Sequence, residues 1–510
     1  MLKAIRKTLA AIFFLGITLI FLDFTGTLHT YLGWMAKIQF LPAVLALNLA
    51  VVVALILLTL IMGRIYCSII CPLGIMQDII GQISSRKKRS PYSYSKEKRI
   101  LRNIMMIVFI ILLVSGFSSL SALLAPYSSF GRIASNLLQP IWILANNGLA
   151  YIAESLDSYA FYSADVWIKS LPTFIIALSS FIIIGILAWR NGRTYCNTIC
   201  PVGTLLSYLA RFSWFKIHFD TDKCRSCSKC STHCKAACID FRNHSVDYSR
   251  CVVCGDCIST CNFNALSYCH TKENKERKDD DKTGIDSIGN AKATNTDKEP
   301  VDNSRRSFLL SMAMASSAMA LAQEGKKVDG GLAAIEDKVA PKRITPITPP
   351  GSNNAKDFAQ HCTACQLCIS ECPNGVLRPS TGLLSIMQPT MSYERGYCRP
   401  ECTRCSEVCP TGAIKKIDKV KKSSIQIGHA VWIKKNCAVL TDKVECGNCA
   451  RHCPAGAITM IPIDPKNENS PQIPAINEAR CIGCGACEYV CPARPFSAIH
   501  VEGNEVHHSI

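Results

Sequence analysis

Four long apolar stretches dominate the first half of the chain. They cover residues 9–29, 41–62, 103–125 and 171–189. Each is long enough, or nearly long enough, to span a bilayer as a helix. The pattern therefore predicts an α-helical membrane domain with four spans over residues 1–215.

Cations flank these stretches unevenly. Lys3, Arg6 and Lys7 precede the first stretch, and segment 64–102 carries nine Lys or Arg residues against two acidic ones. Segment 126–170 has only two cations. Positive charge favours the inner side of a membrane, so the N-terminus and the basic segment are expected inside. The chain is then expected to be inside again after the fourth span.

A ten-residue motif occurs twice in this half. The sequence GRIYCSIICP at residues 63–72 recurs as GRTYCNTICP at residues 192–201, each time after an apolar stretch. This indicates a duplicated unit of two helices plus a C-x3-C-P element. Such duplication favours one pseudo-two-fold site shared by the two copies.

The pattern changes after residue 270. Residues 271–303 are charged, lack aromatic residues and cannot bury a core, which predicts a disordered linker. Residues 304–323 begin with an arginine pair and continue as an uncharged run rich in Ala and Ser, up to Leu321 and Ala322. They are typical of a twin-arginine export signal or membrane segment, here internal. A soluble amphipathic linker is the alternative.

Cysteines carry the chemistry of the remaining sequence. Six quartets account for twenty-four of the 30 cysteines. Four have the spacing C-x2-C-x2-C-x3-C, and two are stretched at the front. Three thiolates on one tight loop can hold three corners of a 4Fe–4S cluster, while the fourth cysteine ligates the neighbouring cluster. The quartets therefore predict three α+β modules of the bacterial-ferredoxin type, at residues 216–270, 355–415 and 430–500.

Cross-ligation gives six expected ligand sets. They are Cys224, Cys227, Cys230 and Cys261; Cys251, Cys254, Cys257 and Cys234; Cys362, Cys365, Cys368 and Cys409; Cys398, Cys402, Cys405 and Cys372; Cys437, Cys446, Cys449 and Cys491; and Cys481, Cys484, Cys487 and Cys453. Cys238 is an alternative to Cys234 as a fourth ligand. Cys269 is expected to be an ordinary buried thiol.

Other uses of the cysteines and of the charge fit less well. Disulfides do not favour repeated C-x2-C-x2-C spacing. Zinc sites usually consist of two C-x2-C knuckles, so a third cysteine at the same interval favours a cluster. The net charge of +18 and the hydrophobic content of 49% agree with a basic membrane protein. Without a basic face interleaved with aromatic residues, the sequence argues against nucleic-acid binding.

The duplicated motif supplies four further thiols, Cys67, Cys71, Cys196 and Cys200. At positions i and i+4 of a helix, the two cysteines of each motif share one face. They could hold an additional metal or redox centre between the copies; simple packing is the alternative. Other polar residues are expected to lie at the membrane boundary: Arg64 and Arg193 as anchors, and Asp23 and His29 as hydrated groups or proton acceptors.

The order of these motifs resembles two known subunits joined in one chain. Residues 1–270 resemble the NapH-type membrane polyferredoxin, and residues 304–495 resemble the NapG-type periplasmic ferredoxin, both of quinol dehydrogenases. The resemblance implies a multi-pass inner-membrane protein whose C-terminal modules are periplasmic. It also implies electron flow from a menaquinol or related membrane quinol, through about six 4Fe–4S clusters, to an extracytoplasmic reductase or cytochrome.

A second function is possible from the same residues. Related polyferredoxins with twin C-x3-C-P elements are associated with copper reduction and oxidase maturation. The four membrane thiols could then bind copper, or the chain could have a regulatory role. Reduction of the clusters by quinol analogues would favour the first function, and copper binding that depends on Cys67 would favour the second.

Overall fold

The computed structural model of the chain describes residues 2–87, 92–270, 338–383, 385–467 and 470–510. The described residues up to His270 and from Val339 onward belong to one compact unit, and of residues 275–338 the structure describes only Lys338. The predicted linker at residues 271–303 therefore lies outside the described residues. The predicted signal at residues 304–323 likewise lies outside the described residues.

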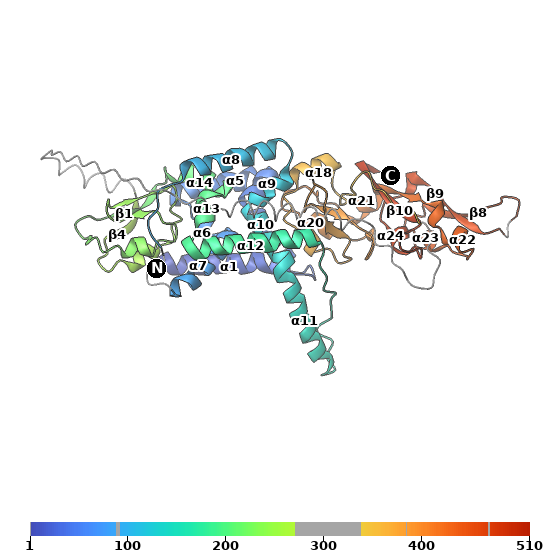
Figure 1. Ribbon diagram of the computed structural model, residues 1–510, viewed down its shortest axis with the longest axis horizontal. Helices are drawn as coiled ribbons and strands as arrows, with labels where there is room; N and C mark the ends of the chain where they lie inside the picture. The colour runs from blue at the N-terminus through green and yellow to red at the C-terminus, as the bar shows by residue number, and fades with distance from the viewer. Residues whose placement is uncertain (1, 88–91, 271–337, 384, 468–469) are drawn as a thin grey trace, which may run out of the picture. The chain divides into compact units, whose positions relative to one another are not determined.

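The first part of the chain folds as packed helices (Figure 1). They are α1 (Leu2–Leu22), α2 (Leu28–Leu32), α3 (Trp34–Lys37), α4 (Phe40–Leu45), α5 (Leu49–Met62), α6 (Tyr66–Ile69), α7 (Pro72–Lys87), α8 (Arg99–Val114), α9 (Ser118–Leu124), α10 (Pro126–Ile133), the π-helical turn η1 (Ala134–Leu138), α11 (Gln139–Glu154), α12 (Leu171–Asn191), α13 (Thr194–Thr198) and α14 (Pro201–Ala210). Helix α12 packs along α7, and α1 contacts α6, α7 and η1.

The predicted membrane domain of four spans is wrong, because two of the apolar stretches are broken. Leu47 takes a positive φ of 52°, and Asn48 caps α5 with its side chain, which separates α4 from α5. Gly116, with a φ of 79°, likewise separates α8 from α9. At 1.5 Å per residue, α5 and α8 reach only about 21 and 24 Å, short of a hydrocarbon core of about 30 Å.

Two helices of the described residues are long and apolar enough to cross a membrane, Lys3–Leu22 and Leu171–Asn191. The second agrees with the apolar stretch 171–189. The first ends earlier than the stretch 9–29, because the chain turns at Asp23. The carboxylate of Asp23 accepts the backbone N–H groups of Thr25 and Leu28 at 2.9 and 2.8 Å. The buried Asp23 side chain therefore stabilises the turn after α1.

The duplication in the sequence is visible in the helices. In each copy an apolar helix ends at a glycine with positive φ, Gly63 or Gly192, which no side chain would adopt readily. A short helix with the two cysteines follows, α6 or α13, and then a helix that begins at the proline of the motif, α7 or α14. Proline suits the first turn of a helix because its missing N–H has no partner there.

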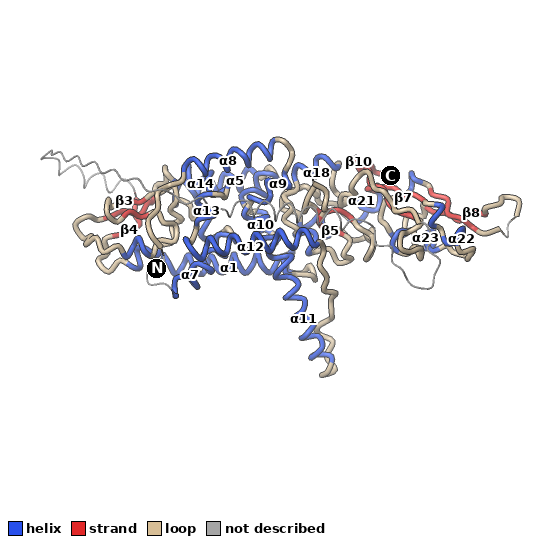
Figure 2. The backbone as a smooth tube through the Cα atoms, viewed as in Figure 1, coloured by secondary structure: helices blue, strands red, loops and turns tan. Residues whose placement is uncertain are grey.

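Each cysteine quartet lies on a loop, except for its third cysteine, which falls in a short helix that follows the loop. Short antiparallel strand pairs frame these segments, and Figure 2 shows the strands in red. The first module contains β1 (Phe215–Phe219), α15 (Lys229–Thr232), β2 (Ile239–Asp240), β3 (Ser245–Val246), α16 (Asp256–Thr260) and β4 (Leu266–His270). Strand β1 pairs with β4 so that Phe215 faces His270, and β2 pairs with β3. The first and last strands of the module therefore close around both quartets.

The second and third modules share one strand pair between them. The elements are α18 (Ala355–His361), α19 (Leu367–Ser370), β5 (Leu377–Pro379), β6 (Pro389–Met391), α20 (Arg404–Val408), α21 (Lys419–Ser424), β7 (Ile425–Trp432), η3 (Lys434–Asn436), α22 (Ala438–Thr441), α23 (Asn448–Arg451), β8 (Ile458–Pro462), β9 (Gln472–Ile476), η4 (Glu478–Arg480), α24 (Ala486–Tyr489) and β10 (Ile499–Ser509). The pairs are β5–β6, β8–β9 and β7–β10, all antiparallel. The last strand, β10, also contacts α18 of the second module.

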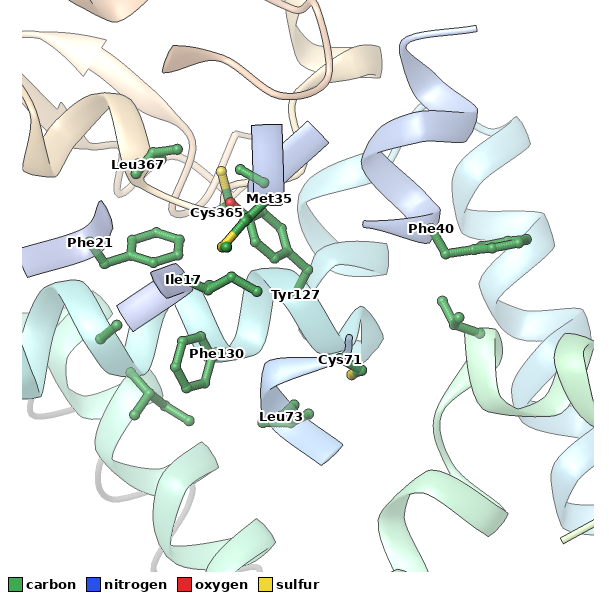
Figure 3. Packing of buried hydrophobic residues seen from close by; sticks show 14 of the residues in the cluster. Ile17, Phe21, Met35, Phe40, Cys71, Leu73, Tyr127, Phe130, Cys365 and Leu367 are labelled. Atoms are coloured by element: carbon green, nitrogen blue, oxygen red, sulfur yellow. The ribbon is translucent and has the colours of Figure 1, made fainter. Parts of the chain in front are cut away.

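One hydrophobic core joins the helices to the first two modules. Phe21, Met35 and Tyr127 from the helices surround Cys365 and Leu367 from the second module (Figure 3). Hydrogen bonds accompany this packing: the amide of Asn136 donates to Gln366 Oε1 at 2.7 Å. Gln366 is itself buried in a cluster loop. The second module is therefore anchored to helices through the backbone that carries its cysteines.

Candidate metal centres

The four regular cysteine loops have the same backbone conformation. In each loop the residues two and four positions after the first cysteine take positive φ. They are Ser226 and Ser228, Val253 and Gly255, Ala364 and Gln366, and Gly483 and Gly485. A left-handed residue before and after the middle cysteine turns the loop in on itself. Three thiols of one loop can then face one point, as a cluster requires.

Left-handed backbone at these positions is strained where the residue is not glycine. Val253 is the strongest case, because a β-branched residue at a φ of 50° is a genuine outlier. Each such residue costs about 1–3 kcal/mol and persists only where its surroundings impose it. The strain is therefore concentrated at the loops that carry the thiols.

The structure brings each fourth cysteine to the loop of its paired quartet. Cys491 joins Cys437, Cys446 and Cys449 around a cavity of about 30 Å³. Cys261 joins Cys224, Cys227 and Cys230, and Cys372 joins Cys398, Cys402 and Cys405, each around about 20 Å³. In the other three sets, Cys234 lies near Cys257, Cys409 near Cys368, and Cys453 near Cys487. These six groupings are the same as the six sets expected from the spacing.

Backbone N–H groups point at the sulfur atoms of the fourth cysteines. Ala265 donates to Cys261 Sγ at 3.4 Å, and Ala457 donates to Cys453 Sγ at 3.2 Å. Ala498 makes the same type of bond to Cys491 Sγ at 3.2 Å. Hydrogen bonds to the sulfurs stabilise their negative charge and tune an iron–sulfur cluster. The donor sets therefore fit 4Fe–4S clusters in both geometry and chemistry.

Cys234 and Cys238 differ in their surroundings, although both thiols are buried and 3.5 Å apart. The residue three positions after Cys234 is Ala237, which has a positive φ. The same feature follows Cys261, Cys372, Cys409 and Cys453, at Asn264, Gly375, Gly412 and Gly456. Cys234 thus has the local backbone of a fourth ligand. Cys269 is half-buried on β4, rather than fully buried as expected, with Ser267 as a neighbour.

The four thiols of the duplicated motif lie together in the helical core. Cys67, Cys71, Cys196 and Cys200 are all buried, and Cys200 lies near the other three. Two arginines cross between the copies: Arg64 Nη2 donates to the carbonyl of Cys196 at 3.2 Å, and Arg193 donates to the carbonyl of Cys67. Both arginines are almost completely buried. The expectation that they anchor the protein at a membrane boundary is therefore wrong.

One carboxylate gathers three cations beside this site. Asp78 on α7 pairs with Arg193 at 2.7 Å, with Lys235 at 3.1 Å and with Arg6 at 3.3 Å. Burial raises the pKa of Asp78, but Arg193 and the other two cations outweigh it and hold the pKa well below its ordinary value. The network connects α1, the second copy of the motif and the first module. The sequence alone does not reveal this network, because its members are far apart in the chain.

A large cavity opens beside Cys372. It measures about 650 Å³, and its walls include Phe24, Trp167, Lys169 and Arg404. Burial lowers the pKa of Lys169 to about 8, and its ammonium donates to Gln139 Oε1 at 3.0 Å. Trp167 lies under the guanidinium groups of Arg378 and Arg395. No motif indicated this cavity, because the segment around Trp167 and the second module meet only in three dimensions.

In the described part of the chain, no group of three or more His, Cys, Asp or Glu side chains is arranged so that it could hold one metal ion.

His29 is partly buried near Lys37, and burial lowers the pKa of its imidazole.

Comparison with known proteins agrees with the donor sets. A family described as "4Fe-4S binding domain" matches residues 44–91 and 173–221, the two copies of the repeat. A family described as "4Fe-4S dicluster domain" matches residues 444–494. The expected cofactor is thereby confirmed in its type, although not in its number.

Three relatives illustrate the range of the similarity. The methylamine utilization ferredoxin-type protein MauM of Methylobacillus flagellatus is 33% identical over 32% of this chain and 70% of its own length. The ferredoxin-type protein NapF of Escherichia coli is 26% identical over 31% of this chain and 87% of its own length. The uncharacterized protein MJ0749 of Methanocaldococcus jannaschii is 21% identical over 54% of this chain and 91% of its own length.

No solved structure matches the chain. The matched families and the ferredoxin-type relatives agree on the chemistry of the cysteines, and they support electron transfer through ferredoxin-type domains. They do not single out a fusion of NapH-type and NapG-type subunits. The chain belongs to the family of 4Fe–4S ferredoxin-type proteins.

Proposed function

We propose that this protein conducts electrons from a membrane quinol to a reductase or cytochrome on the periplasmic side of the inner membrane. Six 4Fe–4S clusters would be held by the six cysteine sets described above, with Cys234 rather than Cys238 as a ligand. A bound cluster of this type accepts and releases one electron at a time. The residues of the chain position these clusters, shield them and define the ends of the route.

The observation that carries this proposal is the position of α1 between two modules. At its beginning, Lys3 Nζ pairs with Asp256 of the first module at 3.2 Å. Near its end, Phe21 packs in the core that includes Cys365, and α1 contacts α19 of the second module. The helix is about 32 Å long, close to the thickness of a hydrocarbon core. If α1 spans the membrane, the two modules face opposite sides.

The exposed surface of α12 supports the same arrangement. Ile175, Ile182, Ile183 and Ile186 are each about half exposed on this helix. A row of large aliphatic side chains facing outward suits lipid better than water. We therefore place α1 and α12 across the inner membrane. The first module then lies in the cytoplasm with the basic segment, and the second and third modules lie in the periplasm.

The cavity beside Cys372 is our candidate for the quinol site. Its aromatic walls suit a flat ring, and Lys169 can donate a hydrogen bond to a ring oxygen. Oxidation of one quinol yields one quinone, two protons and two electrons. The electrons leave one at a time toward the thiol ligand Cys372, and the protons leave through the open side of the cavity. Electrons then enter the chain at the second module. They leave it through the third module, which passes them to the partner protein.

Anaerobic purification of the full chain tests this function. About 24 iron atoms and as much sulfide per chain are expected from six clusters. Addition of a menaquinol analogue should bleach the visible absorption of the clusters. Trp167→Ala should slow this bleaching at least tenfold, while dithionite bleaches the variant fully. The control Trp214→Ala removes an exposed tryptophan of the first module and should behave as the parent.

Two results would contradict the proposal. Iron and sulfide near zero would remove the clusters themselves. A full complement of iron combined with no response to quinol would remove the quinol as the donor. Equal bleaching rates in Trp167→Ala and Trp214→Ala would move the quinol site away from this cavity.

A further inference from the structure

The four thiols of the duplicated motif, which lie outside the six quartets, have the features of an iron–sulfur site of their own. Each copy of the repeat matches a 4Fe–4S binding family but contributes only two cysteines, Cys67 and Cys71 or Cys196 and Cys200. Four thiolates are the usual complement of a two-iron or four-iron cluster. Neither copy is sufficient alone, and the fold brings the two pairs together in the helical core.

The hydrogen bonds to Cys71 and Cys200 are equivalent in the two copies, and the other two thiols also face polar donors. The N–H of Gly203 donates to Cys200 Sγ at 3.3 Å, and the N–H of Gly74 donates to Cys71 in the same way. The amide of Gln77 donates to Cys196 Sγ at 3.3 Å, and Arg64 Nη2 lies 3.9 Å from Cys67 Sγ. Every sulfur of the set thus has a polar donor facing it. Donors directed at sulfur favour the thiolate, which is the form that binds iron.

A buried positive charge gives an independent reason to expect an anionic group here. Arg64 is 1% exposed, and its partners are the side-chain oxygen of Asn197 and two backbone carbonyls. Its Nε has no partner within the described residues, and none of the described ion pairs includes Arg64. The related Arg193 has Asp78 as its counter-ion. A buried charge without an opposite charge is costly, and a cluster with four thiolates carries a net negative charge.

The site also lies on the way from the first module to the second. The backbone N–H of Arg193 donates to the carbonyl of Lys235, next to Cys234, at 2.8 Å. On the other side, Tyr66 lies near Cys67, Cys71 and Cys200, and also near Tyr127, whose neighbours include Cys365 and Cys409. Both tyrosines are buried, and Figure 3 shows Tyr127 beside Cys365 with Cys71 on its other side in this view.

We infer that Cys67, Cys71, Cys196 and Cys200 jointly hold one further iron–sulfur cluster, shared by the two copies of the repeat, which links the first module to the second. One electron arrives from one module and the same electron leaves to the other, so the transfer needs no additional reductant. This inference rests on the proposed function only for its role as a link. The cluster itself is a separate claim about iron.

The test compares the full chain with Cys67→Ser/Cys200→Ser, which removes one thiol from each copy. The control is Cys269→Ser, a half-buried cysteine outside all ligand sets. Iron and sulfide are counted after anaerobic purification, and the clusters are followed by electron paramagnetic resonance during a redox titration. The double variant should lose about two or about four iron atoms per chain and one signal. Cys269→Ser should lose neither.

A second variant keeps the test valid if the double variant does not fold. Arg64→Gln retains the shape and some hydrogen bonding but removes the positive charge. The same signal should remain and shift to a lower potential, because the charge that favours the reduced state is gone. The other signals should not move.

Specific outcomes would overturn the inference. One is a folded double variant with the iron content and the electron paramagnetic resonance signals of the parent. Another is a midpoint potential of the additional signal that is the same in Arg64→Gln as in the parent. A third is a double variant that loses copper instead of iron. If all cluster iron is missing from the parent chain, the proposed function has failed as well. If the iron of the six quartets is complete and only the additional signal is absent, this inference alone has failed.

Discussion

The backbone N–H of Cys398 donates a hydrogen bond of 2.9 Å to the carbonyl oxygen of Cys484. These two cysteines belong to the second and third modules, and each is a ligand in its proposed set. At the same junction the Tyr393 hydroxyl donates to the carbonyl of Gly483 at 2.6 Å. The two cysteine loops are therefore held directly against each other. This contact provides a short route between the modules.

Tyr393→Phe should weaken that junction. The change leaves the Gly483 carbonyl without its buried donor, which costs about 0.5–1.5 kcal/mol. We expect a lower unfolding midpoint in urea for the cluster-loaded protein and slower electron transfer into the third module. The control Tyr151→Phe removes a hydroxyl from an exposed tyrosine of α11, outside the cavity, and should change neither. Equal stability of the parent and Tyr393→Phe would show that this bond does not hold the modules together.

Cys234→Ser and Cys238→Ser should have different effects, although the thiols are neighbours. Cys234 is followed by a positive-φ residue, as are four of the other proposed fourth ligands, and Cys238 is not. Cys234→Ser should lose about four iron atoms per chain, while Cys238→Ser keeps the iron of the parent. Iron and sulfide analysis of both purified variants checks this. The reverse pattern would make Cys238 the ligand.

Asp78→Asn should destabilise the protein most strongly at neutral pH. Three buried cations lose their shared counter-ion, and removal of one partner from a buried ion pair costs about 3–5 kcal/mol. The pKa of Asp78 is depressed in the folded state, so its contribution is fully present above an unfolded pKa of about 4 and is lost as the pH falls toward the folded value.

The difference in unfolding free energy between the parent and Asp78→Asn should therefore narrow below about pH 4. Urea unfolding at several pH values measures it. Asp220→Asn is the matched control, because Asp220 pairs with Lys223 at the surface. A difference between the parent and Asp78→Asn that does not depend on pH would refute the role assigned to the charge.

Gly203→Ala should disturb the helical core although it replaces no cysteine. A Cβ at Gly203 would meet the carbonyl of Cys196 and lie 2.9 Å from Arg64 Nη2. Overpacking of this kind costs about 1–3 kcal/mol. We expect a lower unfolding midpoint than in the parent. Gly185→Ala on α12 is the control, since nothing lies within 4 Å of the Cβ that it adds, and it should be neutral or slightly stabilising.

Spacing along the chain was sufficient to predict the groups of cysteines that the structure brings together. Cys491, for example, was expected beside Cys437, and both line one cavity. Local spacing contains this information because three ligands of each set lie on one loop. The cysteines of the stretched quartets also lie with their expected partners, although the positive φ pattern of the regular loops is absent from their described backbone.

Composition was a poor guide to the helices. The apolar content of residues 41–62 did not reveal the break at Leu47 and Asn48, because a break depends on a few backbone angles rather than on average hydropathy. The roles of Asp78 and of the cavity near Trp167 could not be predicted for a different reason. Their partners come from segments that are 72 or more residues away in the chain, and no local pattern connects them.

The left-handed residues of the cysteine loops have a consequence for how the protein is made. Ser226, Ser228, Val253, Ala364 and Gln366 hold a backbone geometry that such residues avoid when nothing compensates for it. Bonds from sulfur to iron can supply that compensation, whereas an empty loop has to relax. Metal delivery would then complete the folding of these loops, and a polypeptide made without iron would leave them open to proteolysis.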